Sequence, residues 1–367
     1  MQTFTVGKNE AQMRLDKLID RLLPQAEAGF KFKMLRKKNI VLNGKKAAGR
    51  ERVAEGDIIT FYLSDETFNK FKSVPAWTVT DGNVTDRSAT GGSLADTNAA
   101  NRSDMNASGT PARIHAQNGQ AIRPAAGPFK FEEHIVYEDG DVILVSKPAG
   151  ILTQKAQPGD ISLNEYLIDY LLRAHKISAA QLVTFKPSVC NRLDRNTEGL
   201  VCCGISITGL RVLSQMFRDR TVRKFYLAVV KGELKSSARR KAWLVKDESD
   251  NKVRISGQET EGAELIETAW RPVRTGEEYT LAEVELFTGK SHQIRAHLAS
   301  IGYPIAGDAK YGDRSFNDTM RRKYGTKGQL LVAYRIVFPM NDELSGISGR
   351  EFRIDPFTNP RWRFADE

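Results

Sequence analysis

The sequence predicts an α+β protein, with a small N-terminal α/β unit followed by a larger body built on a mixed, largely antiparallel sheet. Its 367 residues are long for one compact core, so two folded units are expected. Two densely patterned stretches are separated by a polar one. In the second dense stretch, helical patterns alternate with successive strands and short turns, which is typical of an α+β body.

The first unit is expected over residues 1–68. Residues 14–18, Arg-Leu-Asp-Lys-Leu, open a helix, and a second helical stretch follows with a run of basic residues. Residues 40–46 predict a strand and a turn at Asn43-Gly44, and residues 53–61 predict a returning strand. Two helices and a short hairpin in this order predict a compact α/β unit.

The positive charge of the chain is concentrated in this unit. The whole sequence has a formal net charge of +10, and residues 1–65 hold thirteen Lys and Arg against eight Asp and Glu, a net of +5. Such a balance indicates a polyanionic partner, either nucleic acid or an anionic membrane surface, and its plain alternative is a solvated basic face. The candidate RNA-binding residues are Arg14, Lys17, Arg36, Lys37, Lys38, Asn43 and Lys45.

Residues 69–127 are predicted to be a flexible linker. Within 81–110 the only large apolar side chains are Val84, Leu94 and Met105, too few to offset the entropy of ordering the segment. No apolar stretch approaches the roughly 20 residues that span a bilayer, and the N-terminus lacks the pattern of a signal peptide, so a cytoplasmic protein is expected. Three cysteines and five scattered histidines match no common metal-site spacing, and no metal is expected.

The second unit is expected over residues 128–367. Residues 135–148 predict two strands around an Asp139-Gly140 turn, and Ser162 with Glu165 has the spacing of a capping box at the start of a helix. A further helix is expected around 210–217. The predicted strands follow at 222–232, 241–247, 263–273 and 280–287, and a short helix over 291–302 is closed by Gly302.

Three segments of this body place polar residues in apolar surroundings. Asp194 lies on a loop entering a strand, Tyr226 lies within a central strand, and Arg295 lies on a helix that follows a glycine-bearing turn. An arginine near a carboxylate would keep it ionised and oriented. The plain alternatives are an Asp in a structural turn, a core tyrosine and an ordinary surface helix.

Both units resemble known families. The first is similar to the S4 RNA-binding domain in R14-L-D-K-L, K38-N-I-V-L-N-G-K and V53-A-E-G-D-I-I. The second resembles the RluA family of pseudouridine synthases in N191-R-L-D-R-N-T-E-G, in K224-F-Y-L-A-V-V-K-G, and in G289-K-S-H-Q-I-R-A-H-L followed by G302-Y-P-I-A-G-D-A-K-Y-G. Asn191 and Glu198 stand where this family usually has histidine and serine.

The resemblance implies an RNA pseudouridine synthase that isomerises uridine without a cofactor. Asp194 would be the catalytic carboxylate, either attacking C1′ or removing a sugar proton, with Tyr226 stacking on the base and Arg295 pairing with Asp194. Arg192 would fill the gap left by the flipped uridine. The implied substrate-binding residues are Arg192, Leu193, Thr197, Gln293 and Ile294.

The implied partner is structured RNA, with 23S rRNA expected first and tRNA as the alternative. A monomer without an obligate protein partner is expected. Two other classes stay open. One is a non-catalytic S4-type RNA-binding or ribosome-assembly protein. The other is a nucleoside glycosidase, which needs two carboxylates and would draw on Asp308 as the second.

Overall fold

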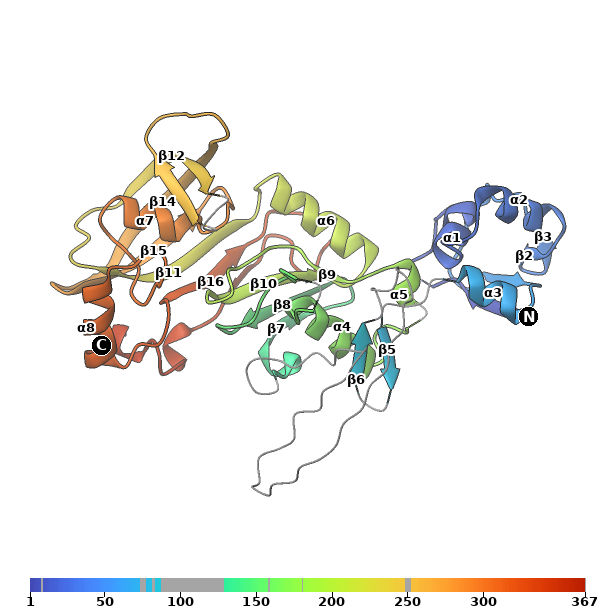
Figure 1. Cartoon of the computed structure of the whole chain (residues 1–367), viewed down its shortest axis with the longest axis horizontal. Coiled ribbons are helices and arrows are strands. Elements are labelled where there is room, and N and C mark those ends of the chain that lie inside the picture. The colour runs from blue at the N-terminus through green and yellow to red at the C-terminus, as the bar shows by residue number, and fades with distance from the viewer. Residues whose placement is uncertain are drawn as a thin grey trace, which may run out of the picture. The chain divides into compact units, whose positions relative to one another are not determined.

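The computed structural model describes residues 1–7, 9–72, 77–80, 83–86, 129–157, 159–179, 181–247 and 252–366. The chain forms two compact units (Figure 1). Unit 1 comprises Met1–Ala125 together with Leu172–Lys186, and unit 2 comprises Ala126–Leu171 and Pro187–Glu367. None of the helices in the described ranges is long and apolar enough to cross a membrane.

Unit 1 contains the predicted helices and hairpin. The helices α1 (Leu15–Leu22) and α2 (Ala28–Arg36) pack on a four-stranded sheet in the order β1-β4-β2-β3. The strands are β1 (Gln2–Thr5), β2 (Ile40–Leu42), β3 (Lys45–Lys46) and β4 (Ile58–Phe61). The strand predicted over 53–61 is shorter, because Asp57 closes a turn with Ala54 and Gly56 has φ +85°.

The predicted domain limits differ from the structure in two places. The helix α3 (Asp65–Phe71), capped by Ser64, runs into the predicted linker, and β5 (Trp77–Thr80) pairs with β6 (Asn83–Asp86) there. The rest of 69–127 lies outside the described residues. The segment 172–186, assigned from sequence to the second unit, belongs to unit 1. Its helix α5 (Gln181–Thr184) packs on α1, and Arg21 donates to the Thr184 carbonyl at 2.7 Å.

Unit 2 is organised by a large mixed sheet, as predicted. The strand order is β13-β12-β14-β15-β11-β16-β10-β8-β7, with β9 beside β10 and β17 beside β16. The pair β10–β16 is parallel, and the other described pairs are antiparallel. The strands are β7 (Ile135–Glu138), β8 (Val142–Lys147), β9 (Ser188–Val189), β10 (Glu198–Gly204), β11 (Arg223–Lys231), β12 (Ala238–Asp247), β13 (Lys252–Ser256), β14 (Glu264–Thr275), β15 (Tyr279–Leu286), β16 (Leu331–Val337) and β17 (Glu351–Arg353).

The helices of unit 2 pack on this sheet at different places along it (Figure 1). The helix α6 (Ile207–Arg218) packs on β10, and α7 (Gln293–Ser300) packs on β13 and β14. The capping box that begins α4 (Leu163–Arg173) is formed, with Ser162 N donating to Glu165 at 3.0 Å. The helix α8 (Arg314–Tyr324) and the C-terminal turns η2 (Pro356–Thr358) and η3 (Arg363–Ala365) share an apolar cluster with β11 and β16.

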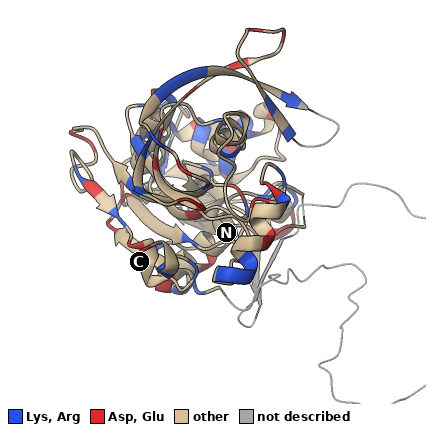
Figure 2. Cartoon of the chain, turned by 90° about the vertical axis from the view of Figure 1, so that its left-hand side faces the viewer, with Lys and Arg blue, Asp and Glu red and all other residues tan. Residues whose placement is uncertain are grey.

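Charge in unit 2 is mixed rather than uniformly positive. Lys and Arg mark the strands that arch across the upper part of the view in Figure 2, where Asp and Glu are interspersed. Two of the arginines are neutralised within the sheet, since Arg239 pairs with Glu267 and Arg271 with Glu283, each at 2.6 Å. Part of the positive charge of unit 2 is therefore neutralised within its own sheet.

The parallel pair β10–β16 generates a prediction at Gly199. This residue has φ +115°, and a Cβ there would lie 2.2 Å from the Ala333 carbonyl oxygen. Gly199→Ala should lower the free energy of unfolding by about 3 kcal/mol, through steric overlap and backbone strain together. The matched control is Gly232→Ala at φ +70°, which has no neighbour within 4 Å and should lose about 1 kcal/mol. Equal losses for the two variants in urea unfolding would contradict the argument.

Candidate active site

One cavity of about 670 Å³ in unit 2 collects the predicted catalytic residues. Asp194 comes from the loop between β9 and β10, Tyr226 from β11, and Arg295 from α7. The five predicted substrate-binding residues also line this cavity: Arg192, Leu193, Thr197, Gln293 and Ile294. Three segments far apart in the sequence therefore meet at one site, as expected from the motif analysis.

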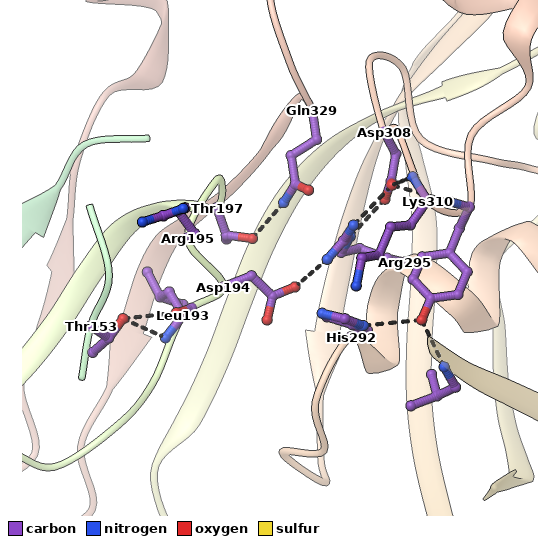
Figure 3. A network of polar contacts seen from close by, with 12 residues as sticks. Thr153, Leu193, Asp194, Arg195, Thr197, His292, Arg295, Asp308, Lys310 and Gln329 are labelled. Carbon is purple, nitrogen blue, oxygen red and sulfur yellow. Dashed lines mark hydrogen bonds and ion pairs between the residues drawn. The ribbon is translucent and has the colours of Figure 1, made fainter. Parts of the chain in front are cut away.

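Arg295 is shared between two carboxylates (Figure 3). Its Nη1 donates to Asp194 at 2.7 Å, while Nε and Nη2 donate to Asp308 at 2.6 and 2.9 Å. Arg295 and Asp308 are buried, whereas the Asp194 side chain is 27% exposed toward the cavity. Asp308 thus holds the Arg295 guanidinium on its buried side. The guanidinium in turn holds the Asp194 carboxylate at the wall of the cavity.

The electrostatics of the Arg295–Asp308 pair favour the charged forms of both residues. Burial alone would raise the pKa of Asp308, but the bonds and charge of Arg295, with the N–H groups of Lys310 and Tyr311, hold that pKa below its ordinary value. Burial opposes the charge of Arg295, yet Asp308 and Asp194 together raise its pKa above the usual range. The buried part of the triad is therefore an ion pair at neutral pH.

The loop that carries Asp194 is held by its backbone (Figure 3). The Thr153 hydroxyl donates to the Leu193 carbonyl at 2.8 Å and accepts from the Leu193 N–H at 3.1 Å. The Arg195 carbonyl accepts from Lys147 Nζ at 3.1 Å and from Gly150 N at 2.8 Å. Both neighbours of Asp194 are thus anchored, which fixes the direction in which its carboxylate points.

Lys147 is a buried amine at the end of β8, fully enclosed by protein. Its Nζ donates to the carbonyls of Pro148, Ile151 and Arg195 at 3.0, 2.9 and 3.1 Å. Burial lowers its pKa to about 7, against the opposing charges of Glu198 and Asp194. Sequence reasoning missed Lys147 and Thr153, although a lysine closing an apolar strand before Pro-Ala-Gly was a visible signal.

Two predicted substrate contacts have their polar atoms engaged by the protein. Gln293 accepts from Thr288 and the Lys290 N–H, and donates to the Glu267 carbonyl and the Thr268 hydroxyl. The Thr197 hydroxyl accepts from Gln329 at 2.6 Å. Both residues line the cavity, but these contacts shape its wall rather than reach for a ligand.

The remaining predicted residues differ in character. Tyr226 is 5% exposed, and burial together with the negative charge of Asp194 raises its pKa above the ordinary value, so the phenol stays protonated. The alternative of a surface helix for Arg295 is wrong, because every residue from Gln293 to Leu298 is buried. Arg192 is exposed at the rim of the cavity.

In unit 1, most of the predicted RNA-binding residues are exposed. Arg36, Lys37, Lys38 and Lys45 are exposed at the end of α2 and in β3. Arg14 is bound to Asp16 at 2.7 Å, and Lys17 lies 3.6 Å from Asp20. The Asn43 side chain closes the turn it occupies, with bonds to Asp57 and the Ile58 N–H at 2.8 Å each.

The contacts of Glu198 account for its presence where the RluA family usually has serine. It is 8% exposed and binds the C-terminal segment, accepting from Arg361 Nη1 at 2.6 Å and from Trp362 Nε1 at 2.8 Å. Arg361 also donates to the Gln329 carbonyl at 3.2 Å, and Gln329 in turn holds Thr197. A carboxylate at this position therefore connects the C-terminal segment to the end of the Asp194 loop.

Among the described residues, no group of three or more His, Cys, Asp or Glu side chains is arranged to hold a metal ion.

The Asp308–Arg295 pair predicts a pH dependence of stability. Because the pKa of Asp308 is lower in the folded protein than its ordinary 3.8, this pair stabilises the fold above about pH 4, and that contribution is lost as pH falls further. Asp308→Asn should cost about 3 kcal/mol at pH 7 and flatten the acid limb. Urea unfolding at about pH 7, 4 and 3 checks this, with the exposed Asp318→Asn as control. A parallel pH profile for Asp308→Asn and wild type would contradict it.

Glu198→Gln should lower the free energy of unfolding by about 2 kcal/mol, because it leaves the Arg361 guanidinium without its anionic partner. Glu343→Gln is the matched control, since its ion pair with Arg211 is exposed and should contribute little. Equal melting temperatures for Glu198→Gln and wild type would show that the C-terminal connection is not stabilising.

Comparison with known proteins agrees with this geometry. Residues 141–300, which include Asp194, Tyr226 and Arg295, match the family model described as RNA pseudouridylate synthase. The chain is 35% identical over 237 residues to the Ribosomal large subunit pseudouridine synthase C of Haemophilus influenzae, covering 64% of this chain and 70% of that relative. It is 32% identical over 194 residues to the Ribosomal large subunit pseudouridine synthase D of Borreliella burgdorferi, covering 52% of this chain and 57% of that relative.

A solved structure supports the fold. The structure described as Human RNA Pseudouridylate Synthase Domain Containing 4 superposes with a TM-score of 0.51 at 19% identity, covering 64% of this chain and 93% of that one. The chain spans about three fifths of the length of several curated relatives that it matches. From the matched relatives and the shared fold, this chain belongs to the RNA pseudouridylate synthase family.

Proposed function

We propose that this protein isomerises uridine to pseudouridine in structured RNA, with Asp194 as the catalytic carboxylate. The observation that carries the proposal is the presentation of Asp194 to the cavity by an arginine whose other edge is fixed by Asp308. The reaction breaks the N1–C1′ bond of uridine, turns the uracil and joins it through C5. Substrate and product are isomers, so no cofactor is required.

The geometry favours one reactive carboxylate over two. The Asp308 oxygens accept from Arg295 and from the N–H groups of Lys310 and Tyr311, and the residue is 1% exposed. A hydrolytic glycosidase would need a second carboxylate free to act on the bond or on water. With Asp308 committed to Arg295, the site favours isomerisation, in which Asp194 either attacks C1′ or removes a sugar proton.

The other cavity residues fit roles in handling the base. Tyr226, kept protonated in an apolar strand, offers a ring for stacking on uracil rather than a ready base. Ile294 packs at the same wall, and the exposed Arg192 at the rim is placed to occupy the gap left by a flipped nucleotide. Flipping costs a few kcal/mol, which contacts elsewhere on the RNA must offset.

The RNA is proposed to be ribosomal, with 23S rRNA first and tRNA as the alternative. Two relatives carry the name ribosomal large subunit pseudouridine synthase. Unit 1 is proposed to be an S4-type RNA-binding domain, because Arg36, Lys37, Lys38 and Lys45 are exposed on it and would neutralise phosphates. A cytoplasmic, monomeric enzyme is the form proposed. The non-catalytic S4 alternative predicts RNA affinity without any modified base.

The test is pseudouridine mapping of cellular RNA from a strain lacking this protein, complemented with wild type, Asp194→Asn or the exposed Asp318→Asn. Wild type and Asp318→Asn should restore one or a few sites, and Asp194→Asn should restore none. The Asn variant keeps the size of the side chain but removes the charge that pairs with Arg295.

Two outcomes would decide against the proposal. Restoration of every lost site by Asp194→Asn would remove Asp194 from the mechanism. No lost site in the deletion strain, together with RNA affinity that survives Asp194→Asn, would favour the non-catalytic RNA-binding protein.

A further inference from the structure

His292 is a cavity residue with no assigned role so far. It lies at the residue before α7, in a left-handed backbone conformation with φ 57° and ψ 10°, and it makes no side-chain cap to the helix. Its ring lines the cavity beside Asp194 and Arg295 (Figure 3). L-residues adopt this conformation uncommonly, and here it goes with a ring that faces the cavity instead of capping α7.

A chain of hydrogen bonds holds the ring by one nitrogen. The Val253 N–H donates to the Tyr311 hydroxyl oxygen at 2.8 Å, and the same oxygen lies 3.0 Å from His292 Nδ1. The hydroxyl has one hydrogen of its own, and His292 Nδ1 is the acceptor placed for it. With the Tyr311 hydroxyl as the donor to Nδ1, the hydrogen of the neutral ring lies on Nε2, on the side away from Tyr311.

The surrounding charges favour the neutral ring. Burial lowers the pKa of His292 below its ordinary value of 6.5, and Arg295 and Lys310 lower it further, while Asp194 and Asp308 act in the opposite direction. At neutral pH the ring is therefore uncharged, and its Nε2–H is a hydrogen-bond donor at the cavity.

We propose that the His292 Nε2–H donates a hydrogen bond to a carbonyl oxygen of the uracil and stabilises the base while it is detached from the sugar. This rests on the proposed function. When the N1–C1′ bond breaks, its electron pair stays on the uracil, and the negative charge spreads to O2 and O4. A fixed donor aimed at such an oxygen is a large source of rate acceleration in a water-excluded site.

The symmetry of uracil makes one donor sufficient for both halves of the reaction. Turning the base about the axis through N3 and C6 exchanges N1 with C5 and, at the same time, O2 with O4. A donor that meets one carbonyl oxygen before the turn therefore meets the other after it. The C5–C1′ bond then forms, C5 loses its hydrogen and N1 gains one, so the atoms balance as an isomerisation.

Two other donor side chains on the cavity wall, those of Arg295 and Gln293, are already committed to protein acceptors. Arg295 Nε, Nη1 and Nη2 bind the two carboxylates, and the Gln293 amide binds the Glu267 carbonyl and the Thr268 hydroxyl. His292 differs from both, because its hydrogen bond to Tyr311 uses Nδ1 and leaves Nε2 for a ligand in the cavity.

The experiment compares His292→Gln, His292→Asn and His292→Phe in the full-length protein. A glutamine amide approximates the position of Nε2, whereas an asparagine amide approximates Nδ1 and tolerates the left-handed backbone. Single-turnover rates of pseudouridine formation should fall about 100-fold for Asn and Phe, and by no more than about tenfold for Gln, with unchanged RNA affinity. A fully active Phe variant, or an Asn variant faster than Gln, would overturn the proposal.

A measurement independent of activity covers variants that fold poorly. ¹⁵N chemical shifts of the histidine rings at pH 7, with the His292 signal identified by its loss in His292→Asn, should show a neutral ring protonated at Nε2. A ring protonated at Nδ1, or at both nitrogens, would overturn the proposal whatever the rates. A wild type that forms no pseudouridine in any RNA defeats the proposed function as well, whereas an active wild type with a fully active Phe variant defeats this inference alone.

Discussion

The site depends on one buried guanidinium that cannot leave its place. Arg295 is committed to Asp308 through two hydrogen bonds and to Asp194 through one, and both Arg295 and Asp308 are shielded from water. A buried ion pair is costly to break, because removing one partner leaves the other charge uncompensated. The direction of the Asp194 carboxylate is therefore fixed by Arg295, which is itself held by its two hydrogen bonds to the buried Asp308.

This arrangement brings together distant parts of the sequence. Asp194 lies before β10, Arg295 lies on α7 and Asp308 lies beyond that helix, so the ion triad forms only when the sheet and α7 are packed. The backbone contacts of Thr153 and Lys147 add a fourth segment. Folding of unit 2 and assembly of the site are thus one event, and a folded unit 2 already holds its carboxylate oriented.

Local patterns predicted most of the fold because local physics determines those elements. The capping box at Ser162, the turn at Asn43-Gly44 and the helix ended by Gly302 all formed as expected. The segment 172–186 was assigned to the wrong unit, because its helix is short and its apolar residues do not reveal which core they join. The strand predicted over 53–61 was too long, because the polar turn that Asp57 closes with Ala54 takes the place of strand pairing before β4 begins.

Some of the site residues could likewise be predicted from local sequence motifs, and others could not. Asp194, Tyr226 and Arg295 could be selected from sequence, because each stands in a motif resembling a known family, and the structure places them around one cavity. The sequence could not show whether Gln293 and Thr197 contact a ligand or another part of the protein. A polar side chain in a motif has the same sequence pattern in both cases, and here both residues are bonded to other segments. Lys147 holds the Asp194 loop by donating to the Arg195 carbonyl, 48 positions away in the sequence. No local sequence pattern can predict a contact over that separation.

Glu198 shows how a departure from a family motif can be structural. A serine at this position could not pair with Arg361 and accept from Trp362 at once, whereas a carboxylate does both. The C-terminal segment that these residues anchor also supplies the apolar cluster beside β11, the strand of Tyr226. The substitution therefore changes what supports the Asp194 loop and leaves the ion triad itself unaltered.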